Sequence, residues 1–378
     1  MILKQAMHKS RLILVISVSV LIILFCVLLA VINQNEPTDL INRGGTEFEK
    51  AKILEVLEED IITGTDYKAG SQKVRLEIMS GNLKGRIFET TNYISYLSGA
   101  YCEKGMTVIV TASVSGEFIV VSVYSSYRAP VLYGFIVLFL LMLWLIGRRK
   151  GLTSAIGLIF TFVCIIFMFI PMVYQGYPPF IAAVAVVILT TVVTLSLMNG
   201  FSAKSVSAMI GTVAGVIIAG IFCALVSHLA GISGYNVSEA EELAVVANQT
   251  NMQVGGILFA SILIASLGAV MDVSMSVAAS IYEVHINNKA LSGKRLFISG
   301  MNVGRDMMGT MSNTLILAFT GRCINTLLLM YSYKTPYNQI INTYSIAIEI
   351  IQGISGSLAV ILTVPIVAAI SVLLIKRK

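Results

Sequence analysis

Charged residues are scarce in this chain, and they are unevenly spread. They make up 12% of its 378 residues, whereas a typical soluble domain carries roughly 25%. No charged residue lies between Lys150 and Lys204, and 56% of all residues are hydrophobic. This composition excludes a soluble enzyme, a disordered chain and an ordinary nucleic-acid-binding protein. It indicates a protein that crosses the membrane several times.

Motifs for metal, nucleotide or redox chemistry are also missing. The sequence has no paired-cysteine or cysteine–histidine spacing, no HExxH, no GxxxxGK[ST] and no dinucleotide-binding glycine pattern. Four of the five cysteines lie in apolar stretches, and only Cys102 falls in a polar region, so no disulfide is available there. We therefore expect no enzymatic activity, no metal site and no cofactor.

The N-terminal apolar run predicts a membrane anchor. It extends from Leu12 to Ile32, and at about 21 residues it can cross a bilayer, whereas a signal-peptide core has about 7–15. Lys4, Lys9 and Arg11 precede it. We expect an uncleaved anchor, with a cleaved signal peptide as the alternative.

One extended polar section follows the anchor, over residues 34–129. It holds 13 of the 20 acidic residues, and Ala51 to Glu58 within it reads as either a strand or a short helix. Four further segments have strand-like patterns: Lys73 to Ile78, Arg86 to Thr90, Thr107 to Ala112 and Phe118 to Val123. About five short strands predict a small β-rich domain, such as a five-stranded barrel of the OB type. A plain spacer between two spans is the alternative.

The remaining residues, 130–378, predict seven more membrane helices. The expected spans are Val131 to Ile146, Leu152 to Met172, Pro179 to Leu197, Ala208 to Leu229, a sixth from near Val254, a seventh from near Met307 to near Tyr331, and Tyr344 to Ile375. The fold class is therefore an α-helical polytopic membrane protein with about eight transmembrane helices. Its three parts are an anchor over residues 1–33, a β-rich domain over residues 34–129 and a seven-helix domain over residues 130–378.

The basic residues orient these spans. With the N-terminus inside, the inner segments carry Arg148, Arg149, Lys150 and the C-terminal lysines, while the short outer loops carry almost no basic residue. Because inner loops of membrane proteins are enriched in Lys and Arg, both termini are expected in the cytoplasm. The β-rich domain is then extracytoplasmic.

Polar residues enter the membrane in the hairpin between the sixth and seventh spans. Asp272 and Ser276 lie on one face of the sixth span, and Arg305, Asp306 and Asn313 lie on the returning helix. Asp272 and Asp306 are both seventeen residues from Lys289, so an antiparallel hairpin places Asp272 level with the Arg305-Asp306 pair. This arrangement predicts a site that couples proton or cation binding to function. A structural ion pair that pins the hairpin is the alternative.

Two further features concern helix packing. Gly211 and Gly215 form a GxxxG pattern, which predicts close approach of another helix. Arg322 lies within the seventh span, and Glu349 is the only acidic residue of the eighth, so the two are candidates for an ion pair. Their positions on either side of the connecting loop match only loosely.

The strings GAVMDVSMSVAASIYEV and GMNVGRDMMGTMSNTLILAFTG resemble the YibE/F family of bacterial membrane proteins. The resemblance extends from about the β-rich section onward. It implies a multi-span fold in a bacterial plasma membrane and no particular substrate. A fainter likeness is to the membrane parts of SecD/SecF and of RND-type exporters, which also place acidic residues in a polar-lined core.

Together these observations predict a transporter or export-assisting protein. Its expected partners are the lipid bilayer, a small solute or ion, and a second copy or a related membrane protein, with no nucleic acid. The alternative is a membrane scaffold or sensor that does not transport and whose outer domain binds a partner.

Overall fold

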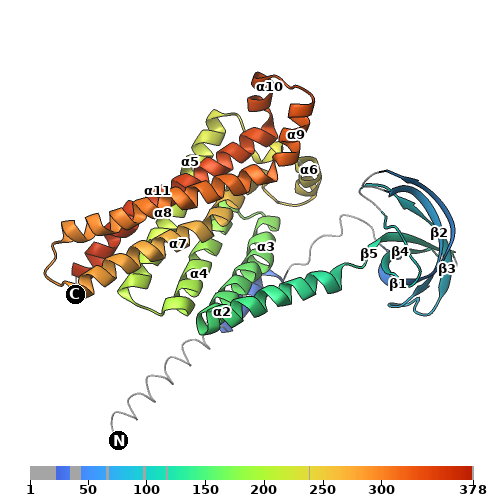
Figure 1. Ribbon diagram of the computed structural model, residues 1–378, viewed down its shortest axis with the longest axis horizontal. Coiled ribbons are helices and arrows are strands. Elements are labelled where there is room, and N and C mark those ends of the chain that lie inside the picture. The colour runs from blue at the N-terminus through green and yellow to red at the C-terminus, as the bar shows by residue number, and fades with distance from the viewer. Residues whose placement is uncertain are drawn as a thin grey trace, which may run out of the picture. The chain divides into compact units, whose positions relative to one another are not determined.

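A computed structural model of the chain describes residues 23–34, 44–64, 68–96, 99–115, 118–237 and 239–376. It contains two compact units, Asp39–Leu143 and a helical unit formed by Met1–Thr38 with Trp144–Lys378 (Figure 1). The predicted boundary after residue 129 follows the last strand, whereas the compact units divide inside the next helix, α2 (Ala129–Cys164). Each unit is described by itself below.

The polar section folds into a five-stranded antiparallel sheet. Its strands follow the order β3-β2-β1-β4-β5. They are β1 (Thr46–Thr63), β2 (Lys68–Ile78), β3 (Ile87–Ile94), β4 (Thr107–Ser115) and β5 (Phe118–Ser126). Residues Ala51 to Glu58, whose sequence is compatible with a strand or a short helix, form the middle of β1. The polar section is therefore a folded β domain, as predicted, and the alternative of a plain spacer is wrong.

The sheet buries one face because its residues alternate. On β2, every second residue from Gln72 to Ile78 is buried, as expected for a strand with one face in a core. Ile53 on β1 and Val108 and Val110 on β4 complete this core. The apolar side chains of three neighbouring strands thus share one interior.

The sheet curls until its two edge strands meet. Register shifts at Ile53/Glu55 and Val56/Glu58 mark bulges in the long strand β1, and bulges increase strand bending and twist. Thr90 Oγ1 on β3 donates a hydrogen bond to the Val121 carbonyl on β5 at 2.6 Å. The domain is a nearly closed barrel, and its strands curve around a common interior in Figure 1.

The helical part follows in chain order. Its elements are α2 (Ala129–Cys164), the π-turn η1 (Ile165–Phe169), α3 (Ile170–Tyr174), α4 (Pro179–Asn199), α5 (Ala203–Leu229), η2 (Gly234–Asn236), α6 (Ala240–Gln249), η3 (Val254–Gly256), α7 (Ile257–Asn287), α8 (Gly293–Arg322), α9 (Ile324–Ser332), α10 (Tyr337–Asn342) and α11 (Tyr344–Lys376). The described residues contain five helical stretches long and apolar enough to cross a membrane, or six if the bent pair α8–α9 counts as one span.

This number is lower than the eight spans predicted, for two reasons besides the bent pair. Of the first predicted span, only the helix Ile23–Ile32 lies within the described residues; residues 12–22 lie outside them. The second and third predicted spans form one helical stretch, Ala129–Tyr174, which is interrupted at Arg148 (φ 47°, ψ −124°).

The seventh predicted span differs most from expectation. It was expected to begin near Met307, but α8 begins at Gly293, where Ser292 Oγ accepts a hydrogen bond from the Arg295 amide. Its first turns are too polar for apolar content to reveal them. The helix also does not continue straight to Tyr331, because α8 and α9 meet at an angle of 57°.

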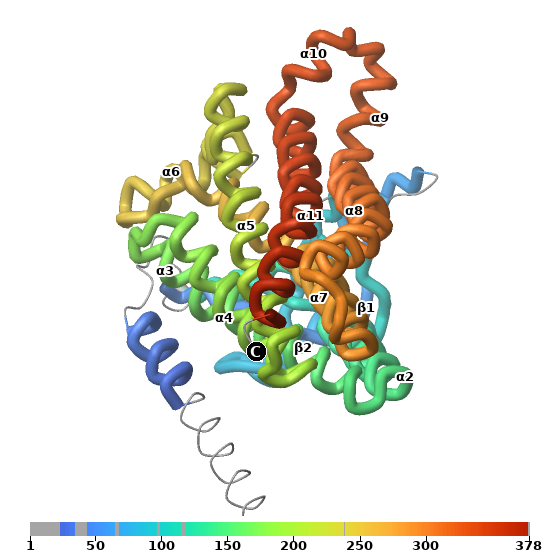
Figure 2. The backbone as a smooth tube through the Cα atoms, turned by 90° about the vertical axis from the view of Figure 1, so that its left-hand side faces the viewer, coloured from blue at the N-terminus to red at the C-terminus, as the bar shows by residue number. Residues whose placement is uncertain are grey.

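Helix α11 lies in the middle of the helical unit. It packs against α5, α7 and α8, and Figure 2 shows α5 and α8 on opposite sides of it. The buried residues of these helices form one continuous apolar core. This core holds α7 and α8, which carry the predicted polar site.

Candidate functional site

The predicted polar residues lie on the antiparallel hairpin of α7 and α8. Helix α7 ends at Asn287 and α8 begins at Gly293. Gly300 of α8 lies directly against the Ile281 side chain of α7. This pairing differs by three residues from a symmetrical arrangement about Lys289, which is less than one helical turn. The two helices therefore lie side by side at close to the expected register.

The charged residues of the hairpin lie at its surface. Asp272 is exposed on α7, and Arg305 and Asp306 are exposed on α8. Arg305 Nη1 donates to Asn302 Oδ1 on its own helix at 3.4 Å. Within the described part of the chain, no ion pair joins Asp272 to Arg305. The fold thus brings the two helices together without the ion pair that was the alternative reading.

The uncharged polar residues of the prediction take two different positions. Ser276 is half-buried on α7, and its carbonyl accepts a hydrogen bond from the Ser280 hydroxyl at 2.9 Å. Asn313 is exposed on α8. The neighbouring hydroxyls of Thr310 and Thr314 donate to carbonyls of their own helix. The Asn313 amide is therefore the main uncharged polar group that this part of α8 presents outward.

Exposed polar and small residues recur along both helices at intervals of three or four. These two stripes, here together called the hairpin face, consist of Ser261, Ala265, Gly268 and Asp272 on α7 and of Asn302, Arg305, Asp306, Gly309 and Asn313 on α8. Polar groups on membrane helices are costly when they face lipid. The hairpin face is therefore suited to meet water or protein.

Glycines distinguish the packed side of the helices from this face. A Cβ on Gly211 or Gly215 of α5 would collide with Val367 or Thr363 of α11, respectively. Around Gly268 and Gly309, by contrast, no described atom beyond the adjacent residues and the local backbone of the same helix lies within 4 Å of such a Cβ. Glycine thus serves close helix packing inside the unit and leaves open space on the hairpin face.

A second candidate lies where α8, α9 and α11 meet. Arg322 Nε lies 3.7 Å from Glu349 Oε1, with the arginine side chain 66% and the glutamate side chain 15% exposed. The sequence suggested this ion pair from a loose positional match. The other carboxylate oxygen, Glu349 Oε2, is buried without a hydrogen-bond partner among the described residues.

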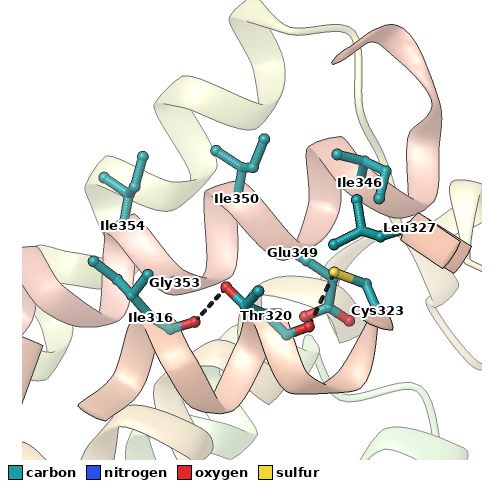
Figure 3. Close-up of a pocket in the computed structure, with 9 residues that line it drawn as sticks. All are labelled: Ile316, Thr320, Cys323, Leu327, Ile346, Glu349, Ile350, Gly353 and Ile354. Atoms are coloured by element: carbon teal, nitrogen blue, oxygen red, sulfur yellow. Dashed lines mark hydrogen bonds between the residues drawn. The ribbon is translucent and has the colours of Figure 1, made fainter. Parts of the chain in front are cut away.

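Glu349 belongs to the lining of an open groove of about 400 Å³. Figure 3 shows this groove, hereafter the α8–α11 groove, whose lining residues are Ile316, Thr320, Cys323, Leu327, Ile346, Glu349, Ile350, Gly353 and Ile354. Sequence reasoning missed it, because its walls come from three helices and depend on the bend after α8. The available signal was the single acidic residue of α11.

Neither candidate resembles a metal centre. Across the described ranges, no group of three or more His, Cys, Asp or Glu side chains could hold a metal ion. The two sites instead combine isolated charges with apolar or small residues.

Comparison with known families identifies the helical part. A family model described as YibE/F-like protein matches residues 135–377. The chain belongs to the YibE/F-like family. Comparisons with curated proteins and with solved structures give no match.

The YibE/F-like match includes α7 and α8, whose sequences suggested the family. It begins at residue 135, after the last strand, and so does not extend into the β-rich section as the resemblance implied. Both the hairpin face and the α8–α11 groove lie within the matched residues. Together with the apolar helices, family membership identifies a membrane protein.

Proposed function

We propose that this YibE/F-like protein is a transport or export-assisting protein of a bacterial plasma membrane that moves a small solute or ion. The position of Asp272, Arg305 and Asp306 on the hairpin face carries this proposal. Ionisable residues within membrane spans are rare because they are costly there, and they usually mark ion or substrate paths. A role in transport would explain why two adjacent helices carry ionisable residues despite their unfavourable free energy in the membrane.

In the proposed mechanism, the Asp272 carboxylate binds a proton or a cation. Binding removes a negative charge from α7 about one helical turn from the level of Arg305 and Asp306 on α8, and so changes the electrostatic balance of the hairpin. An ion can shift a conformational equilibrium only if it binds one state more tightly than the other. Ser276 and Asn313 supply polar atoms along the same path.

We further propose eight spans. The stretch Ala129–Tyr174 has 46 residues, which at about 1.5 Å per residue is roughly 69 Å, more than twice the about 30 Å of a hydrocarbon core. Two spans separated at Arg148 accommodate this length. Counting α8–α9 as one bent span and Ile23–Ile32 as the end of the first gives eight.

An even number of spans puts both termini on the same side of the membrane, and we propose that this side is the cytoplasm and that the β domain lies outside. The basic group Arg148-Arg149-Lys150 then lies on the inner side with Lys289, in agreement with the positive-inside rule. The strand order β3-β2-β1-β4-β5, with β3 beside β5, supports an OB-type barrel. The barrel would receive or release the transported solute.

Ion flux in proteoliposomes tests the coupling site. We expect the wild-type chain to carry a proton or cation flux down an imposed gradient. Asp272→Asn removes the titrating group and Arg305→Gln removes its neighbouring charge, so both are expected to reduce flux to the level of empty liposomes. Fluorescent pH- and cation-sensitive dyes measure this flux.

Glu283→Gln is the matched control, because Glu283 lies exposed on the same helix nearer the loop. It should leave the flux unchanged. Equal flux in wild type and in a folded Asp272→Asn variant would overturn the coupling site. Absence of flux in folded wild-type protein under proton, sodium and potassium gradients would overturn ion coupling itself.

A membrane scaffold or sensor is the second candidate. A groove of about 350 Å³ on the β domain, lined in part by Tyr93, Tyr124 and Arg128, favours it. Exposed aromatic side chains and arginine are enriched where proteins bind partners. This alternative expects a chain without the β domain to lose its function in cells and Asp272→Asn to retain it; the transport proposal expects loss in Asp272→Asn.

A further inference from the structure

The α8–α11 groove has one chemically distinctive feature, a carboxylate in an apolar cleft. Its walls are aliphatic: Ile316, Leu327, Ile346, Ile350 and Ile354. Its volume of about 400 Å³ falls in the range of roughly 300–1,000 Å³ typical of small-molecule sites. Such walls bind apolar groups and leave recognition of charge to the few polar side chains.

Two of the polar side chains that line the groove already donate hydrogen bonds to backbone carbonyls of α8. Thr320 Oγ1 donates to the Ile316 carbonyl at 2.8 Å, and Cys323 Sγ donates to the Thr320 carbonyl at 3.3 Å. Figure 3 shows both bonds running along α8. Among the lining residues, the Glu349 carboxylate is the one charged group, and it is therefore the strongest determinant of which ligand charge the groove accepts.

The partner of this carboxylate holds it only weakly. The contact between Arg322 and Glu349 joins Nε to Oε1 at 3.7 Å, and the arginine side chain is 66% exposed. A well-formed arginine–carboxylate pair is bidentate, with N···O distances of about 2.7–2.9 Å. Glu349 Oε2, meanwhile, has no hydrogen-bond partner among the described residues. A cation in the groove could thus interact with Glu349 without breaking a strong bond.

We propose that the α8–α11 groove binds an amphiphilic organic monocation, with the apolar body against the isoleucines and the positive charge against Glu349. A carboxylate in the lining of an aliphatic cleft favours this class over anions, which it repels, and over neutral apolar molecules, which leave it unpaired. The assignment concerns binding and holds whether or not the hairpin face couples transport to ions.

Tetraphenylphosphonium is a suitable probe, because it carries one positive charge on an apolar body. Its binding to the purified full chain in lipid nanodiscs can be measured by equilibrium dialysis, with empty nanodiscs as the background. We expect saturable binding to the wild type. Glu349→Gln should weaken it at least about tenfold, because a charged contact is lost.

Three comparisons separate this site from a structural ion pair. Arg322→Gln should bind the probe more tightly, since it removes the competing cation; a purely structural pair predicts no gain. Ile350→Trp should block binding by filling the groove, and Glu283→Gln should not affect it. Absence of saturable binding to folded wild-type protein, or equal binding by Glu349→Gln, would overturn the proposal.

Discussion

At the scale of single residues, burial decides how a polar side chain behaves in this protein. Gln72 is fully buried in the barrel, and its side chain accepts a hydrogen bond from the Cys102 amide at 2.8 Å and donates one to the Cys102 carbonyl at 3.2 Å. Asn92 donates to the Ala100 carbonyl at 2.6 Å. Two buried amides therefore hold the segment before β4 in place and satisfy its backbone groups.

The thiol of Cys102 shows the same effect of burial. Burial raises the pKa of Cys102 to about 11, so the thiol stays protonated, and a protonated thiol reacts slowly. In a chain whose other four cysteines are replaced by alanine, we expect Cys102 to react with a water-soluble maleimide far more slowly than a cysteine placed at Lys104, which is exposed. Equal rates in the folded protein would contradict this expectation.

The raised pKa also has a consequence for stability. Between the ordinary thiol pKa near 9 and the folded value of about 11, the folded state binds more protons than the unfolded state. The stabilisation that Cys102 contributes is therefore complete below about pH 9 and decreases as the pH rises toward 11. Thermal unfolding of the full chain at pH 8 and pH 10.5 measures it, and Cys102→Ala should lose this part of the pH dependence.

At the scale of elements, glycine positions determine how closely the helices approach. Gly211 and Gly215 of α5 face α11, and Gly304 of α8 lies against Val364 of α11. Without a hydrophobic driving force between helices in lipid, close backbone packing is a main source of association energy. The central position of α11 thus depends on small residues in its neighbours.

This dependence can be tested with two matched substitutions. Gly215→Ala places a methyl group against Thr363 and should lower stability by about 1–3 kcal/mol through overpacking. Gly309→Ala adds the same group in open space and should be neutral or stabilising by up to about 1 kcal/mol, because alanine favours a helix. Thermal or denaturant unfolding in detergent would show the contrast, and equal effects would refute it.

At the scale of the whole molecule, charge placement predicts orientation. The proposed topology puts the β domain outside and the loop after α7 inside. In intact cells, a membrane-impermeant thiol reagent should label a cysteine at Lys104 and should label one at Lys289 only after lysis. The opposite pattern would overturn the orientation, and labelling of both in intact cells would overturn the proposed count of spans between the two positions.

Much of this fold could be predicted from the sequence, because long apolar runs and alternating strand patterns are local properties. The β-rich section, the helices α4, α5, α7 and α11 and the polar hairpin all follow from such patterns. The start of α8 could not be predicted, because its first turns are polar and resemble a loop. The bend between α8 and α9 at Cys323 lacked a signal too, since apolar composition continues across it.

For the candidate sites, the sequence by itself determined which polar residues enter the apolar region. Asp272, Arg305 and Glu349 stand out there because charge is so rare among their neighbours. Only the tertiary structure decided their surroundings: it left Asp272 exposed, with no ion pair to another described residue, and put Glu349 in the lining of a groove. Exposure and pairing depend on which helices pack together, and that packing sums many weak contacts between residues distant in the chain.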